Sequence, residues 1–492
     1  MTSIGLRRSL VYKVATRMFS NNFSYEDAVH KLNSLQSNKA TIEQIRKEIK
    51  TGQKCTNLKE MEKYLARTGV PLTTLDKLSV IHVAGTKGKG STSAMCESIL
   101  RSHGYRTGFY SSPHLIAVRE RIRLAGRPLS EELFAQYFHK VYDALHKTQK
   151  YEGDMPKYFA FLTVMAFNVF IQENVDVAII EVGIGGIVDY TNVLRKVPVA
   201  GITALGLDHT SILGNTLPEI ALAKAGIMKP DCVAYTVQQP QEAMEVLKRV
   251  ASDVKCPLTV VPEYNTYTFQ NGLRHSIQLD AYRINASLAI QLAHAWMRIA
   301  IDNKSENTDN VKTSGLINKL PKETVIGLRD CKWPGRYHVV ETEFGCVYLD
   351  GAHTRESMEI CAKWFNENCR YQEKILIFSA TGDRDAEILL KPLSHMHFDT
   401  ALFVIPSAYK QITDKSDNYY KTEQNELISR CKKYADIWNN LNHSSRDINV
   451  FECVSDALES INKNRKQSIL ITGSLHLVGA ALSIIDPNLN YS

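Results

Sequence analysis

The stretch Ile81-His82-Val83-Ala84-Gly85-Thr86-Lys87-Gly88-Lys89-Gly90-Ser91-Thr92 decides the fold of this chain. The apolar run at residues 78–84 predicts a buried strand, and a helical pattern covers residues 93–101. A glycine-rich loop between a strand and a helix is the context in which backbone N–H groups and a helix N-terminus hold phosphate. The strict pattern of such loops is not met, because Gly90 separates Lys89 from Ser91. A plain glycine turn is the alternative, although it would not need two lysines and a Ser-Thr pair.

Two further apolar runs bring polar residues to the same edge of the predicted sheet. Residues 175–182 predict a strand that carries Glu181 at its carboxyl end, and residues 197–205 predict another that leads to Asp208 and His209. Ligands of open parallel sheets bind outside the carboxyl ends of the strands, and phosphate-loop enzymes hold Mg2+ with a carboxylate in that place. A single acid at a strand end is often only a turn former. Three polar strand ends together favour a metal–nucleotide site.

The second part of the chain also alternates strands with helices. This alternation predicts an α/β fold with two domains, an N-terminal P-loop ATPase-like parallel-sheet domain and a C-terminal Rossmann-like α/β domain. The polar, aperiodic residues 302–314 indicate the junction. Strands of the second domain are expected at residues 339–349, 375–379, 401–405, 450–453 and 468–472. The predicted ranges are 1–22 for a presequence, 23–310 for the first domain, 311–325 for a linker and 326–492 for the second domain.

Length and composition exclude several classes of protein. The 492 residues are too many for one core, so two domains are expected. The net charge of +7 suits acidic small substrates, and no basic run with interleaved aromatics indicates a nucleic-acid partner. The ten cysteines include no C-x-x-C pair, which indicates reduced thiols. The most apolar stretch, residues 158–171, is too short for an integral membrane segment and predicts a buried helix.

The N-terminus differs from the rest of the chain. Residues 1–25 contain no acidic side chain but several basic ones, and apolar residues recur there at a spacing of four, which gives a helix an apolar stripe. Such a start is typical of a mitochondrial presequence, and an unstructured basic tail is the alternative. We therefore expect a mitochondrial form, in the matrix or at the inner membrane, and a cytoplasmic form that begins at Met18. The basic residues are Arg7, Arg8, Lys13 and Arg17, and the apolar ones are Leu6, Leu10, Val14 and Met18.

Two basic features each allow two interpretations. The segment 118–128 carries four arginines, which predict either a solvated loop or a flap that steers anions toward the phosphate site. Lys224 lies on an apolar predicted helix at residues 215–227. Its side chain either reaches solvent along its own stem or is buried among small neighbours, where burial would lower its pKa.

With these residues in view, the chain resembles the folylpolyglutamate synthase family of the Mur ligase superfamily from Tyr25 to its end. One departure is Ile187, where many relatives carry an arginine. This departure favours the single-activity eukaryotic type over the bacterial type that also makes dihydrofolate. The motifs occur in family order: GTKGKGS (85–91), SSPHL (111–115), YFAFLT (158–163), EVGIGG (181–186), LDHT (207–210), KAGI (224–227), WPGR (333–336), DGAHT (350–354) and TGDRD (381–385).

The resemblance implies a reaction between ATP, a reduced folate or folylpolyglutamate, and L-glutamate. ATP phosphorylates the terminal γ-carboxylate, the amine of glutamate attacks the acyl phosphate, and phosphate leaves. The implied catalytic residues are Lys89, Lys224 and His209, and the implied Mg2+ ligands are Ser112, Glu181 and His209. An imidazole is a less usual Mg2+ ligand, so action through water is the alternative for His209. The implied nucleotide contacts are Thr86, Lys87, Gly88, Lys89, Gly90, Ser91, Asn285, Arg336, Asp350 and His353.

The resemblance implies two further features and leaves alternatives open. Mur-type ligases often carbamylate the lysine that corresponds to Lys224, which then binds a second Mg2+. A monovalent cation such as K+ is a further candidate cofactor, and a monomer is expected. The alternatives are a bifunctional dihydrofolate and folylpolyglutamate synthase, another Mur-type amide ligase, a phosphate-loop kinase, and a non-catalytic mitochondrial RNA-binding protein. A ligase needs glutamate before ADP accumulates and a kinase does not, whereas RNA binding predicts basic stripes with exposed aromatics, which the sequence lacks.

Overall fold

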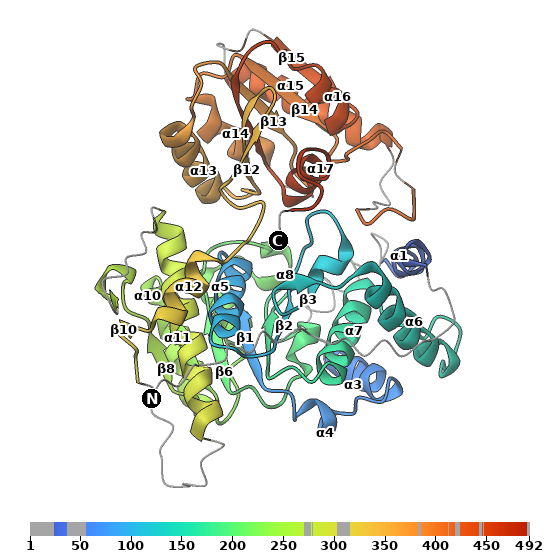
Figure 1. Cartoon of the computed structure of the whole chain (residues 1–492), viewed down its shortest axis with the longest axis vertical. Coiled ribbons are helices and arrows are strands. Elements are labelled where there is room, and N and C mark those ends of the chain that lie inside the picture. The colour runs from blue at the N-terminus through green and yellow to red at the C-terminus, as the bar shows by residue number, and fades with distance from the viewer. Residues whose placement is uncertain are drawn as a thin grey trace, which may run out of the picture.

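Two α/β units lie end to end in the computed structural model, and each is built on its own sheet (Figure 1). The structure describes residues 24–36, 56–269, 277, 279–302, 315–381, 385–411, 413–418, 424–441, 445 and 447–489. The predicted presequence lies outside these residues, as does most of the predicted junction.

An eight-stranded sheet forms the centre of the first unit, in the order β4-β3-β2-β5-β1-β6-β7-β8. Neighbours from β2 to β8 pair in parallel, and β3 and β4 add an antiparallel edge. Strands β1 and β5 are buried along their whole length, as parallel strands covered on both faces are. The strands are β1 (Val80–Ala84), β2 (Thr107–Tyr110), β3 (Ile122–Leu124), β4 (Arg127–Pro128), β5 (Val177–Glu181), β6 (Val199–Ile202), β7 (Val233–Thr236) and β8 (Leu258–Val260).

Helices cover both faces of this sheet. One face packs against α1, α3, α6 and α7, and the other packs against α5, α11 and α12, which spans Lys322–Arg329. The apolar stretch predicted as a buried helix is α7, and no helix in the described part of the chain is long and apolar enough to cross a membrane. The helices are α1 (Tyr25–Ser34), α3 (Asn57–Arg67), α4 (Leu72–Leu75), α5 (Lys89–Ser102), α6 (Glu131–Lys147), α7 (Tyr158–Gln172), α8 (Thr210–Leu213), α9 (Leu217–Ala225), α10 (Gln241–Asp253) and α11 (Asp280–Asp302).

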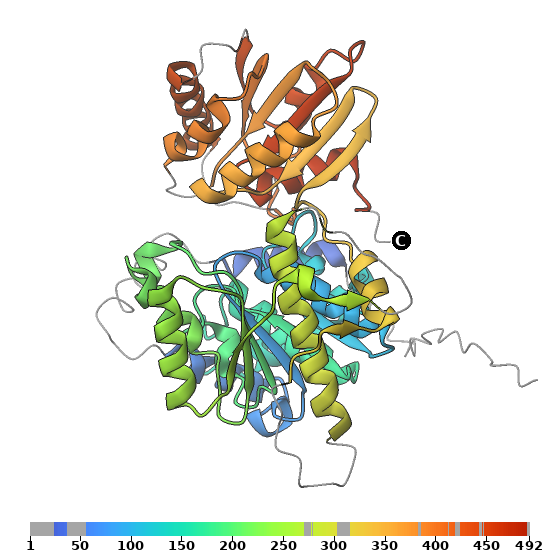
Figure 2. The ribbon, with the colours of Figure 1, turned by 90° about the vertical axis from the view of Figure 1, so that its left-hand side faces the viewer.

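The second unit contains a six-stranded sheet in the order β11-β12-β16-β13-β14-β15, and it lies above the first unit in Figure 2. All its neighbours pair in parallel except β11 and β12. The single strand expected at residues 339–349 is therefore a hairpin. The strands are β11 (His338–Thr342), β12 (Gly345–Asp350), β13 (Lys374–Phe378), β14 (Thr400–Val404), β15 (Asp447–Phe451) and β16 (Gln467–Thr472). The helices are α13 (Arg355–Asn368), α14 (Ala386–Ser394), α15 (Gln424–Leu441), α16 (Val454–Glu459) and α17 (Leu475–Ile485).

The chain crosses between the units later than the sequence suggests. Strand β10 (Lys319–Leu320) pairs with β9 (Thr268–Phe269), and α12 (Lys322–Arg329) shares a hydrophobic core with α5 and α11. A Cβ added to Gly327 would lie 2.6 Å from Ile99 Cα, so α12 packs on the backbone of α5. Residues 319–329 thus belong to the first unit, and we place the crossing at residues 334–337 in place of the predicted linker at 311–325.

Candidate active site

The glycine-rich loop runs from the end of β1 into the first turn of α5. Gly88 adopts the left-handed conformation, with φ of 87°, and Lys89 is the first residue of the helix. A Cβ added to Gly88 would lie 2.1 Å from Asn285 Oδ1, so only glycine fits this turn. The predicted strand–loop–helix is confirmed. Asn285 lies against the loop, and its role as a nucleotide contact stays a prediction.

The loop is held to the neighbouring strand end by its backbone. The N–H groups of Thr86 and Lys87 both donate to Ala204 O, at 3.1 and 3.0 Å, and Thr86 Oγ1 donates to Gly206 O at 3.1 Å. Parallel register places Val83 beside Glu181 and Ala84 beside Ile202. The three strand ends therefore meet at one edge, as the sequence predicts.

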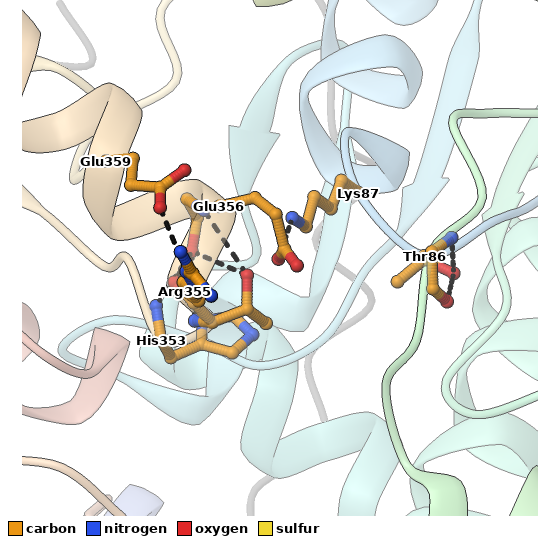
Figure 3. A network of polar contacts seen from close by, with 9 residues as sticks. Thr86, Lys87, His353, Arg355, Glu356 and Glu359 are labelled. Carbon is orange, nitrogen blue, oxygen red and sulfur yellow. Dashed lines mark hydrogen bonds and ion pairs between the residues drawn. The ribbon is translucent and has the colours of Figure 1, made fainter. Parts of the chain in front are cut away.

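Lys87 faces the second unit. Its Nζ lies 2.9 Å from Glu356 Oε2, in the first turn of α13 (Figure 3). In the same view Glu359 instead pairs with Arg355, at 3.0 Å within α13. The structure thus gives Lys87 a protein partner across the domain boundary, and its assignment as a nucleotide contact stays a prediction.

Glu181 ends β5 inside the site. Its side chain is buried, and Oε2 accepts a hydrogen bond from the Ser112 N–H at 3.2 Å. Burial raises the pKa of Glu181 to about 7, although the nearby positive charge of Lys89 opposes the shift. A buried carboxylate of this kind gains most from a cation beside it, and Ser112 lines the same cleft.

The donor set fits Mg2+ only when water or substrate oxygens complete it. No cluster of three or more His, Cys, Asp or Glu side chains in the described residues is placed to hold a metal ion. Mg2+ usually keeps waters and substrate phosphates around one or two carboxylates, which Glu181 can supply. His209 follows β6 on the adjacent loop, where its side chain is 39% exposed and its Nε2 lies 3.8 Å from Asp208 Oδ2. The structure brings Ser112 and Glu181 together, and the ligand role of His209 stays a prediction.

Lys224 is buried, which excludes the interpretation that it reaches solvent. Lys224 is 3% exposed, and its Nζ donates a hydrogen bond to Gly85 O, at the start of the glycine-rich loop, at 2.7 Å. Burial and, to a smaller extent, the positive charge of Lys89 lower the pKa of Lys224 to about 7. A lysine in this position exists partly as the neutral amine at neutral pH.

Of the second unit's three implied nucleotide contacts, Arg336 lines the same cleft and interacts electrostatically with Asp350, whereas the role of His353 stays a prediction. Asp350 is buried at the end of β12, where its Oδ2 accepts the Tyr337 N–H at 3.0 Å. Burial raises the pKa of the Asp350 carboxyl, and the Arg336 guanidinium opposes the shift. His353 Nδ1 lies 2.8 Å from Gly351 O, so the backbone sets the orientation of its ring.

Sequence reasoning missed the aromatic wall of the cleft. Trp333 lies against the loop, since a Cβ on Gly90 would be 2.9 Å from its ring. The Arg123 guanidinium stacks 4.7 Å from the Trp333 ring centroid, and Arg121 Nε donates to His114 Nδ1 at 2.9 Å. Both arginines are buried, so the solvated-loop interpretation of residues 118–128 is wrong for them. In the sequence Trp333 is one residue of the WPGR motif, and only its neighbours in the fold show its contact with Arg123 and the loop.

Comparison with known proteins gives consistent results for both units. The family model for the C-terminal domain of dihydrofolate synthetase matches residues 337–484. Human mitochondrial folylpolyglutamate synthase is 38% identical over 95% of this chain and 93% of its own. The folylpolyglutamate synthase of Saccharomyces cerevisiae strain FostersO is 36% identical over 94% of this chain and 87% of its own.

Solved structures share the fold. Folylpolyglutamate synthase from Thermotoga maritima is 26% identical, with a TM-score of 0.66 over 88% of this chain and 94% of that one. FolC from E. coli, solved in complex with DHPP and ADP, is 24% identical, with a TM-score of 0.66 over 94% and 98% of the two chains. Identity of 38% along nearly the whole length reflects common ancestry and not only a common fold, and this chain belongs to the folylpolyglutamate synthase family.

Proposed function

We propose that this protein is an ATP-dependent ligase that adds L-glutamate to the γ-carboxylate of tetrahydrofolate and of folylpolyglutamates. The observation that supports this most is the position of Lys89, which interacts electrostatically with both Glu181 and Lys224 at the start of α5. Phosphoryl transfer to a carboxylate requires charge neutralisation and positioning more than covalent help from the protein.

The residues of the first unit support the phosphoryl-transfer step. Lys89 and the N–H groups of the loop other than those of Thr86 and Lys87, which donate to Ala204 O, bind phosphate oxygens of ATP while the γ-phosphoryl group moves to the folate carboxylate. Ser91 and Thr86 line the cradle beside Gly88 and Gly90. The amine of L-glutamate then attacks the acyl phosphate, a C–N bond forms, and phosphate leaves with the bonding electrons.

Ser112 and Glu181 would hold Mg2+, and His209 would complete the set directly or through water. The chemistry that such an ion supplies is charge neutralisation at the phosphates. The role of Glu181 itself is to release its proton when positive charge arrives, because its pKa is about 7 in the free protein.

The nucleotide would lie between the two units, in contact with Asn285, Arg336, Asp350 and His353. Closure of the units would then assemble the site. One chain supplies both halves of this site, so we propose that the monomer is active.

Lys224 is proposed to act as a carbamate. Carbamylation requires the neutral amine, and the lowered pKa of Lys224 provides it near neutral pH. The carbamate would place negative charge beneath the loop, where a second Mg2+ and Lys89 can balance it.

We also propose a mitochondrial form and a cytoplasmic form. The acid-free, basic N-terminus supports the first, as does the human relative, whose name includes "mitochondrial".

The test incubates purified protein with tetrahydrofolate, ATP, Mg2+ and labelled L-glutamate, and separates the folates by length. We expect lengthened folates and ADP formation that depends on glutamate. ADP that accumulates at the same rate without glutamate would indicate a kinase. A parallel arm with dihydropteroate tests the bifunctional alternative, which the matching dihydrofolate synthetase model favours. Product in that arm would show the second activity.

A further inference from the structure

A short segment of the second unit, residues 413–418, crosses to the first unit and bonds to helix α1. We call this segment the strap. Asn33 Nδ2 donates to the backbone carbonyls of Asp414 and Ser416, at 2.8 and 3.0 Å. His30 Nδ1 lies 3.1 Å from Asp414 Oδ2, in an exposed pair. The hydrogen bonds between the strap and Asn33 of α1 are therefore accepted by backbone carbonyls of the strap.

At the end of the strap, Asp417 and Asn418 form hydrogen bonds to the backbone of residues 115–118, at the end of the SSPHL motif and just after it. One oxygen of Asp417, Oδ1, accepts hydrogen bonds from Tyr25 OH and from the Val118 N–H, each at 2.6 Å. Asn418 Nδ2 donates to the carbonyls of Leu115 and Ile116, at 3.0 and 3.1 Å. Burial raises the pKa of Asp417, and the two donors oppose this shift. Three parts of the chain that are distant in sequence thus meet at one carboxylate.

The turn at residues 115–118 begins at the wall of the reaction cleft, where Leu115 follows Ser112 along the chain. Leu115 lines the cleft together with Ser112 and Glu181, and its side chain packs in the core of the second unit. Glu120 closes the turn from inside, because its carboxylate accepts the N–H groups of Leu115, Ile116 and Ala117. Two carboxylates therefore accept the N–H groups of this turn. Glu120 of the first unit accepts those of residues 115–117, and Asp417 of the second unit accepts that of Val118.

We propose that Asp417 is a positioning residue for ligation, which fixes the backbone at residues 115–118 and, through it, the cleft wall that carries Ser112. The hydrogen bond from Tyr25 OH holds the Asp417 carboxylate in place, so helix α1 contributes to this positioning although it lies outside the cleft. The activity readout of this proposal rests on the proposed function. The structural readout does not.

The experiment combines amide hydrogen exchange of the free protein with steady-state ligation kinetics. Asp417→Ala should speed exchange in peptides that cover residues 114–121 about tenfold, while peptides from β1 and α17 exchange at the wild-type rate. It should lower kcat by about tenfold or more with a smaller change in KM for ATP, because a displaced wall misaligns the reacting groups. Tyr25→Phe should act in the same direction more weakly. Asp414→Ala is the matched control on the strap and should stay within about twofold of wild type.

Unchanged exchange at residues 114–121 in Asp417→Ala would overturn the proposal, whatever the activity. Exchange that rises evenly across both units with a lower melting temperature would also overturn it, since Asp417 would then only stabilise the whole fold. Tyr25→Phe, which keeps the carboxylate, allows the same two decisions if Asp417→Ala does not fold. A wild-type protein that makes no folylpolyglutamate would instead refute the proposed function, and the exchange pattern alone would then decide the role of the strap.

Discussion

Lys89 has opposite effects on two buried neighbours. It favours the ionised form of Glu181 and the neutral form of Lys224, and the pKa values of both side chains are about 7. A group with a pKa near the working pH changes its protonation at little cost when a substrate or ion arrives. Glu181 and Lys224, to which we assign roles in the reaction, can therefore both change protonation near neutral pH.

Lys89→Ala should reduce ADP formation and ligation by roughly 100- to 1,000-fold, because one stabilising charge at the phosphates is lost. Lys89 is not part of a hydrophobic core, so the melting temperature should change little. The measurement is initial rate at saturating ATP beside a thermal scan. Near-normal turnover would contradict its role in the cradle.

Lys224→Arg should be as inactive as Lys224→Ala. Arginine keeps the positive charge but cannot become a carbamate, and its guanidinium does not fit a site built around one Nζ bonded to Gly85 O. Added short carboxylates should partly restore Lys224→Ala by occupying the vacated space. Wild-type turnover in Lys224→Arg would rule out carbamylation as a requirement.

Glu181→Gln should stabilise the metal-free protein at neutral and alkaline pH while it abolishes ligation. The pKa of Glu181 is raised from 4.5 to about 7 in the folded state, so the folded form binds more protons than the unfolded form between these values. Wild-type stability therefore falls as pH rises from about 4.5 to about 7, by on the order of 3 kcal/mol, and the glutamine variant lacks this loss. Denaturant titrations at pH 5 and pH 8 measure the difference. The same change in stability from pH 5 to pH 8 in the wild type and in Glu181→Gln would show that Glu181 titrates normally, since every other group is common to both proteins.

At the scale of the elements, the sequence predicted what local patterns encode. The loop at residues 85–91 and the ends of β1, β5 and β6 follow from apolar runs and glycines, and they lie where expected. The hairpin of β11 and β12 was missed because residues 339–349 were taken as one strand, although polar residues at 341–343 and Gly345 interrupt the apolar pattern at the turn. The burial of Arg123 was not predictable, because its partner Trp333 is distant in the sequence. The partner of Arg121, His114, lies only seven positions away, but a sequence pattern does not show that the chain turns back there.

The ion pair between α5's loop and α13 is an element-scale link that the sequence could not show, since Lys87 and Glu356 are 269 positions apart. Glu356→Gln should raise KM for ATP by at most about fivefold with little change in kcat, because exposed ion pairs contribute roughly 0.2–1 kcal/mol. Glu359→Gln, whose partner lies in the same helix, is the matched control. Sensitivity to added salt should fall only in Glu356→Gln. A larger fall in kcat would mean that Lys87 itself needs Glu356 for catalysis.

At the scale of the whole molecule, the two units are joined at more points than the chain crossing. The strap, the pair of Lys87 with Glu356, and Leu115 all connect them. Sequence analysis divided the chain into domains by composition, which locates polar stretches but not packing. For that reason it assigned part of α12 to a linker and gave no indication of the strap.

The N-terminal segment gives the last prediction. A product that starts at Met18 lacks Arg7, Arg8, Lys13 and Arg17 but keeps Ser24, whose side chain caps α1 by accepting the Asp27 N–H. It also keeps Tyr25, which bonds to Asp417. We therefore expect the shorter product to stay in the cytosol and to match the full chain in melting temperature and ligation rate, whereas the full chain enters mitochondria. Fractionation of cells that express each form tests the first part, and assays of both purified forms test the second. Equal import of the Met18 product would refute the presequence, because the basic residues that define it would then be dispensable.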